Sequence, residues 1–236
     1  SALKQVRTAN SVTVAAGDLI GASPISSALF LDEPSIKALS MAGLELASVG
    51  NHEFDKGSAE LLRMQKGGCE KHTNREPCAV EPFAGAGFQY LAANVVGSDG
   101  RTLLPGTALK DIGGVKVGFI GMTLEETATL VSPSGVAGLR FVDEAATANA
   151  LVPQLRAAGA DAIVLLIHQG ASTTGRYDDP SCPGLTGDIM PILARLDPAI
   201  QLVVSGHTHS AYICRVPGPG GTSRLLTSAG KYGSLV

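Results

Sequence analysis

The chain has 236 residues, of which 44% are hydrophobic and 17% charged, and its formal net charge is −3. This length and composition predict a globular chain with a sizeable core and exclude an intrinsically disordered one. The absence of any basic block argues against duplex nucleic acid as a partner, and no apolar run approaches the ~20 residues that span a bilayer.

Helical and strand patterns alternate along most of the chain. The first half is predicted to contain helix 2–9, strand 11–16, helix 34–42, strand 44–49, helix 57–65 and strand 88–96. The second half is predicted to contain two strands within 107–122, helix 143–158, strand 161–167, helix 187–196 and strand 200–205, followed from residue 211 by short strands around PGPGG. This alternation is typical of an α/β fold with a largely parallel sheet. We therefore expect one α/β domain over residues 1–236.

Several boundaries in this pattern have local signals. Pro34 stands near the first turn of its helix, where its missing N–H is not needed. Ser58 and Asp143 are candidate N-caps, and Gly159 is a helix stop. Gly113–Gly114 predicts a β-hairpin, so antiparallel strands should flank the parallel core.

The four cysteines are Cys69, Cys78, Cys182 and Cys214. Three of them lie in or beside polar loops, which favours two disulfides, Cys69–Cys78 and Cys182–Cys214, and an oxidising compartment. Four reduced thiols in a cytosolic protein are the alternative. A zinc site from Cys69, His72 and Cys78 is a third, although its spacing matches no common zinc module and it lacks a fourth ligand.

Four of the predicted strands end in short polar motifs. These are GD at 17–18, GNHEFD at 50–55, HQG at 168–170 and GHTHS at 206–210. Because ligands of open α/β sheets bind beyond the carboxyl ends of the strands, we expect the motifs to meet at one edge. They would bring together Asp18, Asn51, His52, Asp55, His168, His207 and His209.

The distribution of histidine supports this convergence. The chain has five histidines, and four of them lie in these motifs. Each residue taken singly also has a structural interpretation: Asp18 could cap a helix, Asn51 could hold a left-handed turn, and a lone histidine after a strand is commonly a hydrogen-bonded loop residue. Their joint occurrence favours a functional site.

The residue types in the motifs indicate the chemistry. Imidazole, carboxylate and amide oxygen together suit Zn, Mn, Fe or Mg. A carboxylate such as Asp18 can bridge two such metals, and two metals ~3.5–4 Å apart can clamp the attacking and leaving oxygens of a phosphoryl displacement. A histidine that is not a ligand can act as a general acid, and His52 with Asp55 fits that pair.

The motifs GD, GNHE, a histidine and GHxH, in this order, resemble those of the calcineurin-like metallophosphoesterases. The longer match of GDLIGASPISS, GNHEFD and GHTHS resembles the bacterial 5′-nucleotidase branch and extends over nearly the whole chain. The resemblance implies a four-layer α-β-β-α sandwich with mixed sheets. It also implies a periplasmic or secreted enzyme that hydrolyses phosphomonoesters, foremost 5′-nucleotides, by metal-activated water.

The resemblance implies a role for each matching position. Asp18 would bridge two divalent metal ions, whose other ligands would be Asn51, His168 and His207 at the second site and His209 at the first. His52, held by Asp55, would assist the leaving group. Glu53 belongs to the motif but is expected to be structural, and we assign it no chemical role.

Two features of the family are not found in this sequence. The family opens with a strand ending in D-x-H, which supplies two ligands to the first metal, and no D-x-H occurs in the 236 residues. We therefore expect the second site to bind metal, the first to be empty or weakly occupied, and the chain to be a fragment. We also expect a C-terminal nucleotide-specificity domain in the full-length protein, because that domain follows the metal domain in the family.

Other functions remain open at this point. The same chemistry could serve a cyclic-nucleotide phosphodiesterase, a nucleotide-sugar hydrolase or a broad phosphatase. A catalytically impaired nucleotide-binding module is a second class, which the presence of both His52 and Asp55 argues against. A zinc-stabilised structural domain is a third, and an α/β core of this size does not require a metal to fold.

Overall fold

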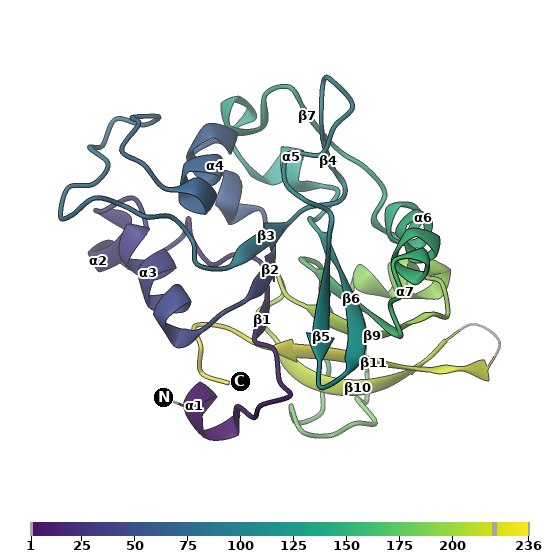
Figure 1. Cartoon of the computed structure of the whole chain (residues 1–236). Helices are drawn as coiled ribbons and strands as arrows, with labels where there is room; N and C mark the ends of the chain where they lie inside the picture. Colours follow the sequence, from purple (N-terminus) through teal and green to yellow (C-terminus); the bar gives the residue numbers. More distant parts are fainter. Residues whose placement is uncertain (1, 219–220, 236) are drawn as a thin grey trace.

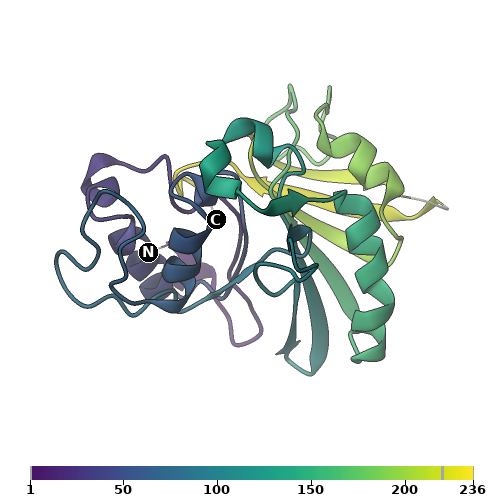
Figure 2. The same cartoon turned by 90° about the horizontal axis from the view of Figure 1, so that it is seen from above.

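Two β-sheets lie face to face between two layers of helix in the computed structural model, which describes residues 2–218 and 221–235 (Figure 1). Seen from above, the helices of the first half of the chain lie on one side and those of the second half on the other (Figure 2). This arrangement confirms the predicted four-layer α/β sandwich with mixed sheets.

The first sheet has three short parallel strands in the order β1-β2-β3. They are β1 (Val14–Ala16), β2 (Leu46–Ser48) and β3 (Gln89–Leu91). Helices α3 (Glu33–Ala42) and α4 (Ser58–Lys66) connect them and cover the outer face. Ile36 of α3 and Leu61 of α4 belong with Ala47 of β2 to one buried apolar cluster, which holds this layer together.

The second sheet has six strands in the order β10-β11-β9-β8-β6-β5, of which the inner four are parallel. They are β5 (Thr107–Ile112), β6 (Val115–Met122), β8 (Ala162–Ile167), β9 (Ile200–Ser205), β10 (Ala211–Pro217) and β11 (Ser223–Ala229). The hairpin β5–β6 and the pair β10–β11 supply the antiparallel edges, as predicted. Part of the PGPGG loop, residues 219–220, lies outside the described residues.

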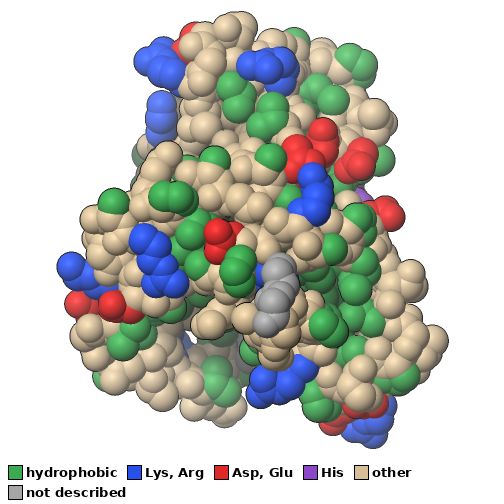
Figure 3. Space-filling view, turned by 90° about the vertical axis from the view of Figure 1, so that its right-hand side faces the viewer, with side chains coloured by type: hydrophobic (Ala, Val, Ile, Leu, Met, Phe, Trp, Pro, Cys, Tyr) green, Lys and Arg blue, Asp and Glu red, His purple; other side chains and the backbone are tan. Residues whose placement is uncertain are grey.

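Helices α6 (Glu144–Ala157) and α7 (Ile189–Arg195) cover the outer face of the second sheet. The predicted N-cap of α6 is confirmed, because the Asp143 carboxylate accepts a hydrogen bond from Ala146 N at 2.7 Å. On the face shown in Figure 3, acidic and basic side chains are interspersed and form no basic stripe.

Between the sheets, Leu46 and Leu91 of the first sheet contact Phe119, Val164 and Leu166 of the second. These five side chains are buried, so the two sheets share one apolar interface. The interface packs the sheets against each other in a fixed relation. The loops that leave β1, β2, β8 and β9 therefore come together.

Several predicted boundaries were wrong. The single strand expected at 88–96 is divided into β3 and β4 (Val95–Gly97), because Ala92 N and Ala93 N donate instead to Pro105 O and Gly121 O. Strand β4 pairs with β7 (Leu139–Phe141) in a separate two-stranded sheet. Ser58 is not an N-cap but the first residue of α4, which Gly57 precedes with φ +90°.

Short elements complete the fold. The N-terminal helix α1 (Ala2–Val6) is shorter than the predicted 2–9. Four further short helices were not predicted: α2 (Ile25–Ala28), α5 (Thr127–Leu130) and the 3-10 helices η1 (His52–Phe54) and η2 (Pro133–Val136). No helix in the described part of the chain is long and apolar enough to cross a membrane.

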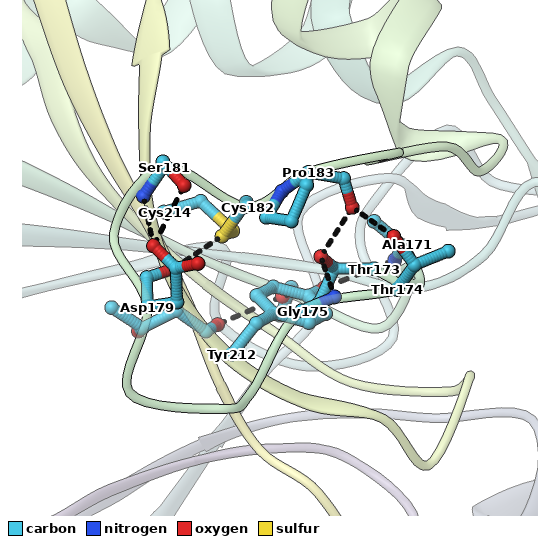
Figure 4. The surroundings of a disulfide bond; sticks show 12 residues. Ala171, Thr173, Thr174, Gly175, Asp179, Ser181, Cys182, Pro183, Tyr212 and Cys214 are labelled. Atoms are coloured by element: carbon cyan, nitrogen blue, oxygen red, sulfur yellow. Dashed lines mark hydrogen bonds between the residues drawn. A yellow bond between two sulfur atoms is a disulfide. The ribbon is translucent and has the colours of Figure 1, made fainter.

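Both predicted disulfides, Cys69–Cys78 and Cys182–Cys214, are present. All four cysteines lie within the described residues and none is free, so the reduced-thiol and zinc alternatives were wrong. The Cys182–Cys214 bond ties the loop after β8 to β10, beside the ring of Tyr212 (Figure 4). Tyr212 also binds this loop, because its hydroxyl accepts from Ala171 N at 3.0 Å.

Candidate functional site

The loops after β1, β2 and β8 meet through hydrogen bonds at the carboxyl ends of their strands. Asp18, after β1, accepts a hydrogen bond on Oδ1 from the backbone N–H of His52, after β2, at 2.9 Å. His168, directly after β8, binds the carbonyl oxygen of Ala16 in β1 through Nδ1 at 2.6 Å. The expected convergence of these distant segments is therefore present.

Asp18, His168 and His207 form the core of the site. Each offers one ligand atom, and these atoms all lie within 4.8 Å of one another. Within residues 2–218 and 221–235, no other group of three histidine, cysteine or acidic side chains meets that condition. His168 Nε2 lies 3.0 Å from Asp18 Oδ2, and its side chain is only 1% exposed.

The hydrogen bonds of His168 direct one ring nitrogen into this cluster. Its Nδ1 donates to the Ala16 carbonyl, so Nε2 faces Asp18 Oδ2 and also Asn51 Oδ1, which is 3.1 Å away. A backbone carbonyl on the far nitrogen is the usual partner of a metal-ligating histidine, because it sets the tautomer and the ring orientation. The donor set of two imidazoles, a carboxylate and an amide oxygen therefore fits a divalent metal ion.

Asp18 and His168 influence each other's protonation. Burial would raise the pKa of Asp18, but the hydrogen bond and charge of His168 lower it below the usual value. Burial would lower the pKa of His168, but Asp18 raises it. At His207, burial and the neighbouring charge of His168 lower the pKa. Because a ligating imidazole nitrogen must be unprotonated, a proton and a metal ion would compete for His168 Nε2.

Two glycines let the loops after β1 and β2 approach each other. A Cβ on Gly50 would lie 2.2 Å from Asp18 Oδ1, and a Cβ on Gly17 would lie 2.6 Å from Gly50 N. Both distances are shorter than any allowed contact. The glycines in the GD and GNHE motifs are therefore required for the close approach of backbone to backbone.

Glu53 joins the loop after β1 to the loop after β2. Its buried carboxylate accepts hydrogen bonds from Asp18 N at 2.8 Å, Leu19 N at 2.7 Å and Gly50 N at 2.6 Å. Burial, followed by the charge of Asp18, raises the pKa of Glu53 to about 7. These hydrogen bonds agree with the structural role expected for Glu53 and show which backbone groups it holds.

His52, the first residue of the 3-10 helix η1, and Asp55, which directly follows its last residue, form a separate and more exposed pair. His52 Nδ1 lies 2.8 Å from Asp55 Oδ2, and the two side chains are 37% and 34% exposed. The helical turn brings the side chains of these two residues to one side. Because Nδ1 is engaged by Asp55, Nε2 is the ring nitrogen that remains for a ligand.

His209 lies near the core of the site but outside it. Its charge acts on the pKa of His207, while its ring lies 6.2 Å from that of Tyr232. Of the seven predicted site residues, Asp18, His168 and His207 have ligand atoms within 4.8 Å of one another. Asn51 joins them through its Oδ1, which lies 3.1 Å from His168 Nε2. His52 and Asp55 pair beside them.

A cleft of about 570 Å³ opens beside Asp55. Its walls come from the start of α4, the Cys69–Cys78 loop and the segment of η2. The side chains facing it are mostly hydroxyl, amide and imidazole groups, including Ser58, His72, Asn74 and Ser134. The cleft leaves polar space next to the His52–Asp55 pair.

A family model described as calcineurin-like phosphoesterase matches residues 2–211. Among curated proteins, the chain is 32% identical over 234 residues to "Endonuclease YhcR" of Bacillus subtilis, a match that covers 99% of this chain and 18% of that protein. It is 37% identical over 212 residues to "Cell wall protein Lmo0130" of Listeria monocytogenes, covering 86% and 27%. It is 29% identical over 180 residues to the 5′-nucleotidase of Vibrio cholerae, covering 75% and 28%.

A solved structure shares the fold. The 5′-nucleotidase precursor of Thermus thermophilus is 25% identical, with a TM-score of 0.70, and the match covers 98% of this chain and 42% of that one. The chain thus spans less than a third of the length of the curated relatives above and less than half of this structure.

Proposed function

The chain belongs to the calcineurin-like phosphoesterase family, and from that premise we propose that it hydrolyses phosphomonoesters, with 5′-nucleotides as substrates. The observation that carries the proposal is a buried carboxylate–imidazole cluster, Asp18 with His168 and His207, beside the more exposed pair His52–Asp55. The first group suits a divalent cation, and the second suits proton transfer to a leaving group.

Two divalent ions, drawn from Mn, Zn, Mg or Fe, are proposed as cofactors. Asn51, His168 and His207 would hold one of them, Asp18 would bridge both, and His209 would serve the other. When bound, such ions activate water and neutralise charge on the phosphoryl oxygens. The site of Asn51, His168 and His207 should bind more firmly, because these side chains already converge with Asp18.

His52 would assist departure of the nucleoside. Its Nδ1 is held by Asp55 at 2.8 Å, which orients the ring. Nε2 could then donate a proton to the ester oxygen as the bond to phosphorus breaks. Protonation matters here because a nucleoside 5′-alkoxide is a poor leaving group.

The nucleotide as substrate is supported by the relatives. The Vibrio cholerae relative and the Thermus thermophilus structure are both named 5′-nucleotidases. Both are much longer than this chain, so a C-terminal nucleotide-specificity domain is proposed for the full-length protein. A periplasmic or secreted location is proposed as well, since two disulfides persist in oxidising compartments.

The decisive experiment measures phosphate release from 5′-AMP with added Mn²⁺, with and without EDTA. We expect release that EDTA abolishes and that His52→Ala lowers by about a hundredfold, the lower range for loss of a general acid. The exposed Asp178→Ala variant is the control for purification and metal loading. Release that persists in EDTA, or a His52→Ala variant as active as the parent, would contradict the proposal.

A second candidate is hydrolysis of phosphodiesters. It is favoured by one relative, which is named an endonuclease and matches 99% of this chain. Rates on bis(p-nitrophenyl) phosphate and p-nitrophenyl phosphate separate the two candidates. A phosphomonoesterase should prefer the monoester, and a preference for the diester would favour the second candidate.

A further inference from the structure

Asp32 is a fully buried carboxylate that none of the four polar motifs contains. It is 0% exposed and stands immediately before α3, with a left-handed backbone at φ 67°. A buried charge of this kind is costly unless its hydrogen bonds are complete. The hydrogen-bond donors that approach it, which include Ser23 of the loop after β1, therefore identify what it holds in place.

Two of these donors share one oxygen of the carboxylate. Asp32 Oδ2 accepts from Lys56 Nζ at 2.6 Å and from the backbone N–H of Gly21 at 3.2 Å, and Ser27 Oγ donates to Oδ1 at 3.0 Å. Burial would raise the pKa of Asp32, but the Lys56 ammonium lowers it, so the carboxylate is ionised at neutral pH. One oxygen thus joins the loop after β1 to the segment after η1.

Both segments border the His52–Asp55 pair. Lys56 is the residue after Asp55 in the chain. Gly21 packs so closely that a Cβ there would lie 2.3 Å from His52 O and 2.8 Å from Asp55 Oδ2. Asp32 therefore binds two neighbours of the His52–Asp55 pair. One is the backbone N–H of Gly21, which packs against both residues, and the other is the side chain of Lys56, which follows Asp55 in the chain.

We propose that Asp32 and Lys56 are positioning residues that hold the His52–Asp55 pair in the geometry for proton donation to the leaving oxygen. The proposal rests on the proposed phosphomonoesterase function. Asp32 is fully buried and acts only through the pair, whereas Lys56 also lines the cleft, so a contact of Lys56 with substrate would show as a change of KM in Lys56→Met that Asp32→Asn lacks. The effect of both residues through the pair should depend on how much the leaving group needs a proton.

That dependence supplies the test. A nucleoside leaves as a poor alkoxide and needs protonation, whereas p-nitrophenolate leaves readily without it. With Mn²⁺ added, Asp32→Asn and Lys56→Met should lower kcat for 5′-AMP by about tenfold, a part of the 10²–10⁴ that a general acid contributes, and change kcat for p-nitrophenyl phosphate less than about twofold. KM for both substrates should change little.

Two control variants distinguish a loss of positioning from a general loss of folding or activity. Lys56→Arg keeps a cation opposite Asp32 and should retain most of the activity on 5′-AMP. Glu60→Gln removes an equally buried carboxylate, 2% exposed and paired with Arg63 at 2.7 Å, and should not distinguish the two substrates. Mn²⁺ affinity, measured by calorimetry, should be the same in Lys56→Met as in the parent.

The proposal fails if the variants lose activity equally on both substrates, or lose none. It also fails, without reference to turnover, if a crystal structure of Lys56→Met keeps the His52–Asp55 distance and the position of Gly21 unchanged. If the parent hydrolyses neither substrate, the proposed function is wrong, and the crystal structure of the variant still decides the positioning role.

Discussion

The two sheets supply the candidate site in different ways. In the six-stranded sheet, β8 is buried at five of its six positions, and its end delivers His168 directly. In the three-stranded sheet, each strand has only three residues. Asp18 and Asn51 lie in loops beyond them, and His52 begins η1. The loops of the small sheet are held instead by buried carboxylates, Glu53 and Asp32. Strand β8 thus places His168 by apolar burial and strand pairing, whereas charged hydrogen-bond networks hold the loops of the small sheet.

The largest expected effect is the loss of activity when a ligand is removed. It should be similar for the two sheets, because both contribute ligands to one cluster. His168→Ala from the large sheet and Asp18→Ala from the small one should each lower kcat/KM on 5′-AMP about a thousandfold, since several kcal/mol of metal-derived stabilisation is lost. Bound metal, measured by mass spectrometry after dialysis, should fall in both. A variant that keeps full metal content and activity would show that its residue is not a ligand.

The second prediction distinguishes the two sheets by comparing stability with Mn²⁺ affinity. Glu53→Gln places an amide donor against the backbone N–H groups of Asp18 and Gly50, so both stability and Mn²⁺ affinity should fall, stability by about 2–3 kcal/mol. Ile163→Ala, in β8 and 2% exposed, should cost a similar ~2–4 kcal/mol and leave Mn²⁺ affinity unchanged. Urea unfolding and calorimetry measure the two quantities. Equal losses of affinity in the two variants would remove the distinction drawn between the sheets.

The third and smallest expected effect is a dependence of folding stability on pH, which originates mainly from Glu53 beyond β2 of the small sheet. The pKa of Glu53 is raised to about 7 in the folded protein, above the usual 4.5. A raised pKa means that the folded state favours the protonated form, so its stabilisation is complete below pH 4.5 and lost as pH rises through 7. The raised pKa of His168 has the same sign, the lowered pKa of His207 opposes it up to about pH 6.5, and the lowered pKa of Asp18 matters only in acid.

In EDTA, stability should therefore fall on the order of 2 kcal/mol between pH 5 and pH 8. Thermal unfolding across this range tests the prediction. Glu53→Gln should flatten the slope relative to the parent, whereas Ile163→Ala should only displace the curve. A parent whose stability is constant or rises from pH 5 to 8 would contradict the assignment.

Much of the larger sheet could be predicted because its signals are local. The run AIVLLI at 162–167 is apolar and bounded by polar residues, and β8 and β9 were predicted to within one residue at each end. The pairing of the cysteines could also be inferred from their loops. The strands of the smaller sheet were predicted too long, because their apolar residues extend beyond the three residues that pair.

The sequence by itself determined which chemistry is available: four of the five histidines follow strands in motifs that also carry Asp18, Asn51 and Asp55. Strand and helix periodicity determined that these motifs meet, since parallel strands share one carboxyl edge. Only the tertiary structure decided that residues 88–96 divide between two sheets, that His209 lies outside the three-residue cluster, and that Glu53 and Asp32 are buried clamps. The physical reason is that the energy of a buried carboxylate depends on which donors surround it, and those donors come from segments whose approach is set by packing.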